Sequence, residues 1–191
     1  MDNDEKRSCG TCSLCCKLLG IKEIAKPAAQ WCPHCLPGSG GCSIYATRPA
    51  ECRSFECMWL SSPLGDEWRP TRSKMVMSYF NNDRGPDEHS FRIYVDSGSP
   101  AIWRRAPYYM QIKGMALRGL LGTGRYGFYR TFVHVRSNTW LVLPGKDVDI
   151  TDKHYRVLRM GQESWDVQVL NQEEVVSPKE GERDGVSPPT W

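Results

Sequence analysis

The nine cysteines of this 191-residue chain all lie in its first third. They stand at positions Cys9, Cys12, Cys15, Cys16, Cys32, Cys35, Cys42, Cys52 and Cys57. Cysteines that only fill a core would be scattered along the chain, whereas pairs at two-residue spacings let two sulfurs converge on one metal ion. Thiolate is a soft ligand that suits zinc and iron–sulfur clusters. We therefore expect this region to bind metal.

The spacing of the cysteines fits two kinds of metal site. Cys9 and Cys12, followed by Cys32 and Cys35, have the spacing of a zinc ribbon. The run from Cys9 through Cys12 to Cys15 instead resembles a ferredoxin-type cluster loop, without the proline-bearing fourth cysteine that usually follows. The spacing alone does not separate these sites, so zinc and iron both stay open as cofactors, an iron–sulfur cluster included.

Cys15 and Cys16 are adjacent in the sequence. Side chains of adjacent residues usually point in different directions, so the pair rarely serves one mononuclear site. The two cysteines could supply two neighbouring sites or one polynuclear cluster, and eight thiolates would also suffice for two four-thiolate sites. A closed four-thiolate site is structural, whereas open iron sites or bridging clusters permit redox chemistry.

The rest of the sequence favours a reducing compartment for these thiols. No apolar run is long enough to cross a bilayer. The first eight residues lack the apolar stretch of a signal peptide. We therefore expect a cytoplasmic protein with no membrane partner, and in the cytoplasm thiols stay reduced. An odd number of cysteines also argues against a disulfide framework.

A longer signature, GCSIYATRPAECRSFEC, occupies residues 41–57. Together with the run CGTCSLCC at residues 9–16, it resembles the YkgJ-type cysteine-cluster family, described as a zinc- or iron-chelating domain. The resemblance covers residues 9–60, and more loosely the β-rich remainder. It implies metal binding rather than a particular reaction, so no catalytic residue is assigned.

Carried over one position at a time, the resemblance implies eight metal ligands: Cys9, Cys12, Cys15, Cys16, Cys32, Cys42, Cys52 and Cys57. Cys35 falls at a position that is often apolar in the family, which weakens the zinc-ribbon pattern. His34 is either a further ligand or a solvent-facing loop histidine, and we expect the second.

Four other residues of the signature have physical interpretations. Ile44 and Tyr45 are expected to pack over the sulfurs and exclude water. Arg48 and Arg53 could offset the negative charge of a thiolate cluster, with surface ion pairs as the alternative for each arginine.

The fold that must position these residues is predicted to be α+β. An irregular cysteine-rich metal-binding module is expected to pack on a small, mostly antiparallel β-sheet with one or two helices. The expected division of the chain is a mobile N-terminus at 1–8, the cysteine module at 9–60, the α+β body at 61–170 and a disordered tail at 171–191.

Apolar patterns and turn residues predict the elements of each part. Helices are expected at 12–20, 48–58 and 107–121, and strands at 74–80, 91–95, 127–135, 139–143 and 165–170. The strands 74–80 and 91–95 should form one antiparallel pair, and 127–135 and 139–143 another. The string GTGRYG at 122–127 matches a dinucleotide fingerprint but follows a helix and precedes a strand, so we interpret it as a loop.

Charge is distributed unevenly along the chain. Residues 97–146 carry eight Lys and Arg and no acid, whereas residues 147–191 carry five bases and ten acids. Basic and aromatic residues together can follow a nucleic-acid backbone. Because these bases are spread along the segment, we expect a solvated face beside the acidic tail, and keep nucleic acid or another polyanion as the alternative partner.

The sequence thus predicts a cytoplasmic protein that chelates zinc or iron through clustered thiolates. Two alternatives stay open: an iron–sulfur oxidoreductase or electron-transfer protein, and a zinc-stapled module that binds nucleic acid or another polyanion. Whether the chain is an enzyme is left undecided.

Overall fold

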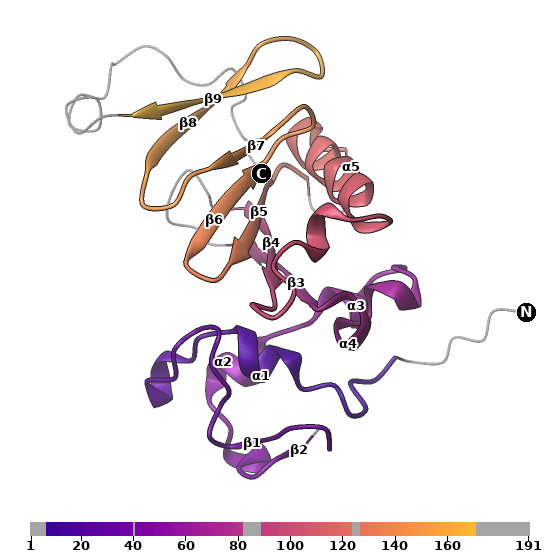
Figure 1. Cartoon of the computed structure of the whole chain (residues 1–191), viewed down its shortest axis with the longest axis vertical. Helices are drawn as coiled ribbons and strands as arrows, with labels where there is room; N and C mark the ends of the chain where they lie inside the picture. The colour runs from indigo at the N-terminus through magenta and orange to yellow at the C-terminus, as the bar shows by residue number, and fades with distance from the viewer. Residues whose placement is uncertain (1–6, 40, 82–88, 124–126, 171–191) are drawn as a thin grey trace, which may run out of the picture.

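A mixed five-stranded sheet lies at the centre of the computed structural model, which describes residues 7–39, 41–81, 89–123 and 127–170 (Figure 1). The strands follow one another across the sheet in chain order: β3 (Met75–Asn81), β4 (His89–Val95), β5 (Arg130–Val135), β6 (Asn138–Val142) and β7 (Asp147–Asp149). Short helices and a long one pack around it, so the chain has the predicted α+β fold.

Both predicted antiparallel pairs, β3–β4 and β5–β6, are confirmed. They join through a parallel contact between β4 and β5, which the sequence did not predict. A parallel contact needs a crossover connection. The long helix α5 (Tyr108–Leu121) lies in this connection, and it matches the helix predicted at 107–121.

The end of α5 is set by two glycines. Gly122 adopts a φ of +68°, the left-handed conformation that commonly ends a helix. A Cβ on Gly119 would lie 2.5 Å from the ring of Tyr129, so a larger residue there would push the helix away from the segment that enters β5. The Tyr129 hydroxyl also donates to the carbonyl oxygen of Met115 in α5, at 3.0 Å.

One face of the sheet carries the main core. Four short elements cover it beside α5: α3 (Met58–Ser61), η3 (Asp66–Trp68), α4 (Pro70–Ser73) and η4 (Ile102–Arg104). The buried side chains from strands and helices include Met75, Met77, Phe91, Ile93, Val133, Val142, Trp59, Trp68, Trp103, Tyr108 and Ile112. Large aromatic side chains thus supply much of the buried area that holds α5 and the short helices on the sheet.

The opposite face has two separate covers. Near β3, Leu14 and Leu18 of α1 (Leu14–Leu18) are buried against Val76. Farther along, the hairpin of β8 (His154–Arg159) and β9 (Trp165–Leu170) packs over Phe132 and Leu141. Figure 1 shows the cysteine-rich segment at one end of the molecule and this hairpin at the other.

The cysteine module is built from very short elements. They are α1, η1 (Lys22–Ile24), β1 (Cys35–Leu36), β2 (Gly41–Cys42), η2 (Tyr45–Thr47) and α2 (Ala50–Ser54). The helix predicted at 48–58 is wrong as a single element, because Phe55 and Cys57 are extended between α2 and α3. This extended segment lets Phe55 pack near α1 on one sheet face while Cys57 packs against the core on the other.

Other sequence predictions had different outcomes. The helix predicted at 12–20 is present only as α1, and β7 and β8 were not predicted. The tail at 171–191, most of the N-terminal stretch at 1–8 and the centre of the string at 122–127 lie outside the described residues. Arg7 is described, and its guanidinium donates to the carbonyl oxygens of Trp59 and Ser62. Within the described ranges, no helix combines the length and apolar character needed to cross a membrane.

Candidate metal centre

The nine cysteines are all free thiols, and four of them surround one small cavity. This first thiol group consists of Cys9, Cys12, Cys15 and Cys57, and the cavity that it lines has a volume of about 20 Å³. A volume of this order holds a single water-sized guest. Trp59, Leu60, Pro70 and Val76 complete the wall.

The first thiol group lies where the module meets the body. The amide of Cys12 donates to the carbonyl oxygen of Cys9 at 2.9 Å, which closes a tight turn. Gly10 occupies this turn with a φ of +52°, a conformation that suits glycine. Cys15 is placed by α1, and Cys57 by the extended segment before α3.

The other five cysteines form a second thiol group, made of Cys16, Cys32, Cys35, Cys42 and Cys52. Several contacts bring their segments together. The amide of Cys32 donates to the carbonyl oxygen of Cys16 at 3.0 Å, and the side chains of Cys16 and Cys35 are hydrogen-bonded. Cys35 pairs with Cys42 across β1 and β2. Cys52, on α2, feels the charges of Cys16, Cys32 and Cys42.

Cys15 and Cys16 stand where the two groups meet: Cys15 lines the cavity, and its side chain is hydrogen-bonded to that of Cys16 in the second group. The groups are neighbours, because the charge of Cys16 also raises the pKa of Cys9. The eight ligands predicted from the sequence divide into four in each group, with Cys35 as the additional member of the second.

The cysteine pKa values show how crowded these thiols are. Burial is the main cause that raises the pKa of Cys9, Cys52 and Cys57, and the charges of neighbouring cysteines add to it. Burial and the charge of Cys16 raise the pKa of Cys35 to about 11. A hydrogen bond with Cys15, followed by burial, raises the pKa of Cys16 still further. A bound metal cation would lower these pKa values, since coordination deprotonates thiols outright.

A lysine that the sequence did not single out lies beside the second thiol group. Lys26 is only 5% exposed, and its ammonium donates to the carbonyl oxygens of Lys17 and Leu19. Burial lowers the pKa of Lys26, while the charges of nearby cysteines, Cys32 and Cys16 first, oppose that shift. The buried ammonium is therefore a positive charge available to a thiolate cluster.

Three residues of the signature, Tyr45, Arg48 and Arg53, contact one another. The guanidinium of Arg48 lies 3.9 Å from the ring centroid of Tyr45, and Arg53 donates to the Arg48 carbonyl oxygen at 2.6 Å. Tyr45 is 66% exposed, so the prediction that it excludes water is wrong. The carbonyl oxygen of His34 accepts hydrogen bonds from the amide and the hydroxyl of Ser43.

Two buried N–H groups near the first thiol group have no hydrogen-bond acceptor among the described residues: Trp59 Nε1 and Arg69 Nε. Trp59 lines the cavity, and the Arg69 guanidinium lies 5.4 Å from its ring centroid. The charge of Arg69 also lowers the pKa of Cys9, against the larger effect of burial. Donors of this kind commonly hydrogen-bond metal-bound thiolates.

The side chains do not form a finished coordination site. Among the described residues, no group of three or more His, Cys, Asp and Glu side chains is arranged so that it could hold a metal ion as it stands. The features that a metal could use are the clustered thiols and the two unsatisfied N–H donors near the first thiol group.

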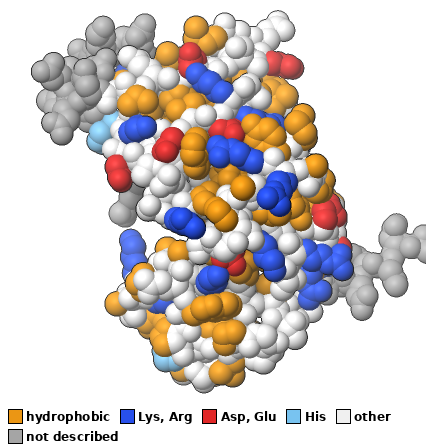
Figure 2. Space-filling view, in the orientation of Figure 1, with side chains coloured by type: hydrophobic (Ala, Val, Ile, Leu, Met, Phe, Trp, Pro, Cys, Tyr) orange, Lys and Arg blue, Asp and Glu red, His pale blue; other side chains and the backbone are white. Residues whose placement is uncertain are grey.

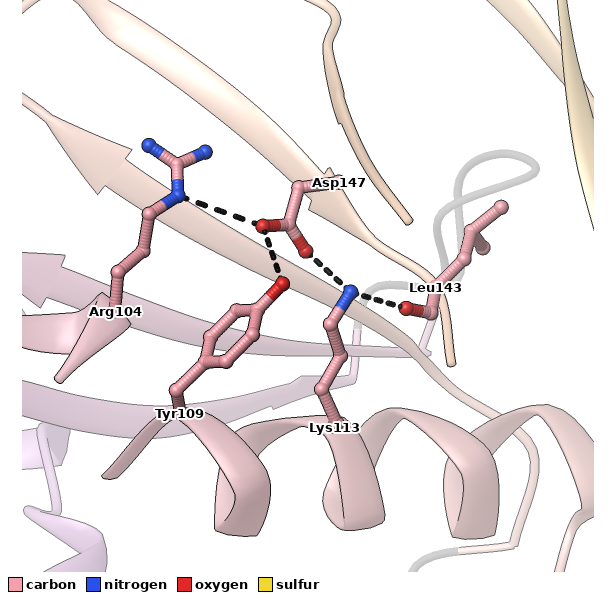
Figure 3. A network of polar contacts seen from close by, with 5 residues as sticks. All are labelled: Arg104, Tyr109, Lys113, Leu143 and Asp147. Atoms are coloured by element: carbon pink, nitrogen blue, oxygen red, sulfur yellow. Dashed lines mark hydrogen bonds and ion pairs between the residues drawn. The ribbon is translucent and has the colours of Figure 1, made fainter. Parts of the chain in front are cut away.

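A second polar cluster lies in the body, between α5 and β7 (Figure 3). The buried ammonium of Lys113 donates to Asp147 Oδ1 at 2.5 Å and to the Leu143 carbonyl oxygen at 2.7 Å. Tyr109 donates to Asp147 Oδ2 at 3.1 Å, and Arg104 Nε lies 3.5 Å from the same oxygen. This network fastens α5 to the sheet.

The network also changes the interpretation of the acid-free segment. Lys113 and Arg104 share Asp147, and Lys146 pairs with Asp166, so acids from outside the segment neutralise part of its charge. The expectation that these bases form a solvated face is wrong for Lys113, which is buried.

Comparison of the chain with family models, with curated proteins and with solved structures found no match. Fold and site define an α+β protein with a cysteine-rich module at one end of its sheet. The resemblance to the YkgJ-type family stays a prediction.

Proposed function

We propose that this chain is a metal-binding protein that chelates zinc or iron through two neighbouring groups of thiolates. The proposed ligands of the first site are Cys9, Cys12, Cys15 and Cys57. Those of the second are Cys16, Cys32, Cys42 and Cys52. The observation that supports the proposal most is the gathering of four predicted ligands around one cavity and of the other four around Cys52.

Electrostatics supports two sites. A divalent ion with four thiolates carries a formal charge of about −2, which nearby cations and N–H donors stabilise. One cation accompanies each group: Arg69 lies near Cys9, and the buried Lys26 lies near Cys32 and Cys16. Bound zinc would supply a closed structural link between segments, whereas bound iron would in addition permit electron transfer.

The architecture of the module also supports a structural role for metal. Its strands β1 and β2 have two residues each, and its helices α1 and α2 have five. Elements this short are not stable by themselves. Metal coordination can provide the missing folding free energy, as it does in small zinc domains.

An iron–sulfur electron carrier is the second candidate, and one observation favours it. Trp59 Nε1 and Arg69 Nε are buried near the first thiol group without an acceptor among the described residues. Hydrogen bonds to cluster sulfurs are one of the means by which proteins set the reduction potential of an iron–sulfur centre. An ultraviolet–visible spectrum separates the candidates, because sulfur-to-iron charge transfer is coloured and zinc thiolates are not.

The test is elemental analysis of protein purified without oxygen, combined with cysteine variants. We expect metal in both sites of the full chain. Cys57→Ser should remove the metal of the first site only, and Cys52→Ser that of the second only. Cys35→Ser is the matched control, since Cys35 lies in the second thiol group but is not a proposed ligand, and it should keep the full metal content.

Absence of stoichiometric zinc or iron from the anaerobic protein would overturn the proposal. Loss of all metal in each of the two single variants would indicate one polynuclear cluster instead of two sites. Far-ultraviolet circular dichroism of each variant shows whether the α+β body is still folded, so that loss of a ligand is distinguished from loss of the fold.

A further inference from the structure

A groove on the body lies between η4 and the turn that joins β5 to β6. It has a volume of about 450 Å³. Its polar and aromatic lining consists of Trp103, Arg104, Arg136, Ser137, Asn138 and Trp140, and no Asp or Glu that the structure describes lines it. The groove is separate from both thiol groups, and the proposed metal binding does not use it.

Arg104 is held in one orientation at the groove wall. Its guanidinium lies 4.0 Å from the ring centroid of Trp103 and 4.3 Å from that of Trp140. Its Nε is directed at Asp147, whereas its two terminal nitrogens point away from the carboxylate (Figure 3). Those terminal nitrogens have no hydrogen-bond partner within the described parts of the chain. A guanidinium fixed in this way loses little conformational entropy when it binds a ligand.

Arg136 supplies a second guanidinium from the turn between β5 and β6. Its φ of +56° fits a tight hairpin turn, and its side chain is exposed. No described acid forms an ion pair with it. The neighbouring Ser137 hydroxyl donates to Asn138 Oδ1 at 3.2 Å. The side-chain amide nitrogen of Asn138, Nδ2, has no acceptor among the described residues and can still donate.

The described residues that line the groove carry two positive charges, on Arg104 and Arg136, and no negative one. One carboxylate, that of Asp147, is shared between Lys113 and Arg104, and Arg136 adds a further positive charge. On the face seen in Figure 2, Lys and Arg side chains lie among hydrophobic ones over the middle of the molecule. Two guanidinium groups and a side-chain amide donor at one groove are common chemistry for recognition of phosphate and carboxylate groups.

We propose that this groove binds an oxyanion, a phosphate or carboxylate group carried by a small ligand, between Arg104 and Arg136. A nucleic-acid backbone is disfavoured as the occupant, because Asp147 and Asp166 already pair with Lys113 and Lys146. A small ligand needs only the two guanidinium groups and the Asn138 amide.

The test is nuclear magnetic resonance of the full-length protein, titrated with inorganic phosphate and with acetate at constant ionic strength. We expect saturable shifts of the Trp140 indole N–H and the Asn138 side-chain amide with at least one anion. The anion that saturates first identifies the ligand chemistry. Removal of one charged hydrogen-bond partner in Arg136→Gln should weaken the affinity about tenfold.

Arg105→Gln is the matched control, because Arg105 is exposed and adjacent to Arg104 but does not line the groove. It should leave the affinity unchanged. Arg104→Lys, which keeps the charge but loses the planar fork, should weaken binding without loss of the fold. The proposal is overturned if neither anion produces a saturable shift, or if Arg105→Gln weakens binding as much as Arg136→Gln does. Binding of a single-stranded oligonucleotide that is far tighter than that of either anion, with a steep salt dependence, would also overturn it.

Discussion

The cysteine module and the α+β body of this protein are stabilised in different ways. The body surrounds a sheet whose main face buries tryptophans, methionines and branched side chains in one continuous core. The module attaches to the sheet through Leu14, Leu18 and a few partly buried neighbours, and carries nine thiols on short helices, short strands and the loops between them. One chain thus combines a region that can fold by apolar burial with a region that lacks the apolar area to do so.

The two thiol groups lie at different places relative to the module and the body. The first lies at the border, where Trp59 and Val76 of the core form part of its cavity. The second lies within the module, around β1, β2 and α2. We infer that metal in the first site would join the two regions, whereas metal in the second would order the module alone.

The largest expected effect comes from removal of metal. Structural zinc contributes roughly 10–16 kcal/mol in small zinc-binding peptides, so a chelator should abolish amide-exchange protection in the module. Amides of β3 to β6 should stay protected, because their core needs no thiol. Exchange measured by mass spectrometry before and after chelation tests this. Equal loss of protection in β4 and β5 would contradict the separation of the two regions.

The next effect is expected from truncation of the body core. Trp68 is 0% exposed, packs edge-to-face on Tyr108 at 4.9 Å and donates from Nε1 to Gln111. Trp68→Ala should lower the free energy of unfolding by about 3–5 kcal/mol, since it leaves a large cavity. Urea denaturation followed by circular dichroism measures the change.

The module supplies the matched control for this substitution. Trp31 is 45% exposed and has its clearest contact with the Lys17 ammonium, at 5.8 Å from the ring centroid. Trp31→Ala should cost less than about 1 kcal/mol, as an exposed substitution does. A cost equal to that of Trp68→Ala would mean that the module has an apolar core of its own.

A smaller effect, confined to acid conditions, is expected at the sheet face that the module covers. His134 stacks on Tyr94 at 4.9 Å, and burial, with a contribution from the charge of Arg92, lowers its pKa from 6.5 to about 4. The folded protein therefore keeps this imidazole neutral while the unfolded chain takes up a proton below pH 6.5. With respect to His134, the free energy of unfolding is highest above pH 6.5, and it falls by roughly 3 kcal/mol as the pH drops towards 4.

Denaturation curves at pH 7 and pH 4.5 measure this acid sensitivity. His134→Gln should remove most of the pH-dependent difference, because the substituted side chain does not titrate. A difference that persists unchanged in His134→Gln would assign the acid sensitivity to other groups.

Much of the body could be predicted because local signals decide it. Alternating apolar residues mark β3, β4, β5 and β6, and Pro107 and Gly122 bracket α5 as expected of helix ends. β7 is only three residues long, and the break between α2 and α3 depends on packing of Phe55 and Cys57 against opposite sheet faces, so neither left a clear pattern in the sequence. The parallel contact of β4 with β5 is likewise set by the path of α5 across the sheet.

The sequence by itself determined that this protein concentrates nine cysteines in one module ahead of an α+β body. It also determined that Cys15 and Cys16 are adjacent. Only the tertiary structure decided which distant thiols each one meets, because Cys57 and Cys52 reach them through contacts between segments about 40 residues apart. It also brought Lys26 beside the second group and placed Arg104 and Arg136 in the lining of one groove. Long-range packing sets such distances, and residue spacing carries no information about them.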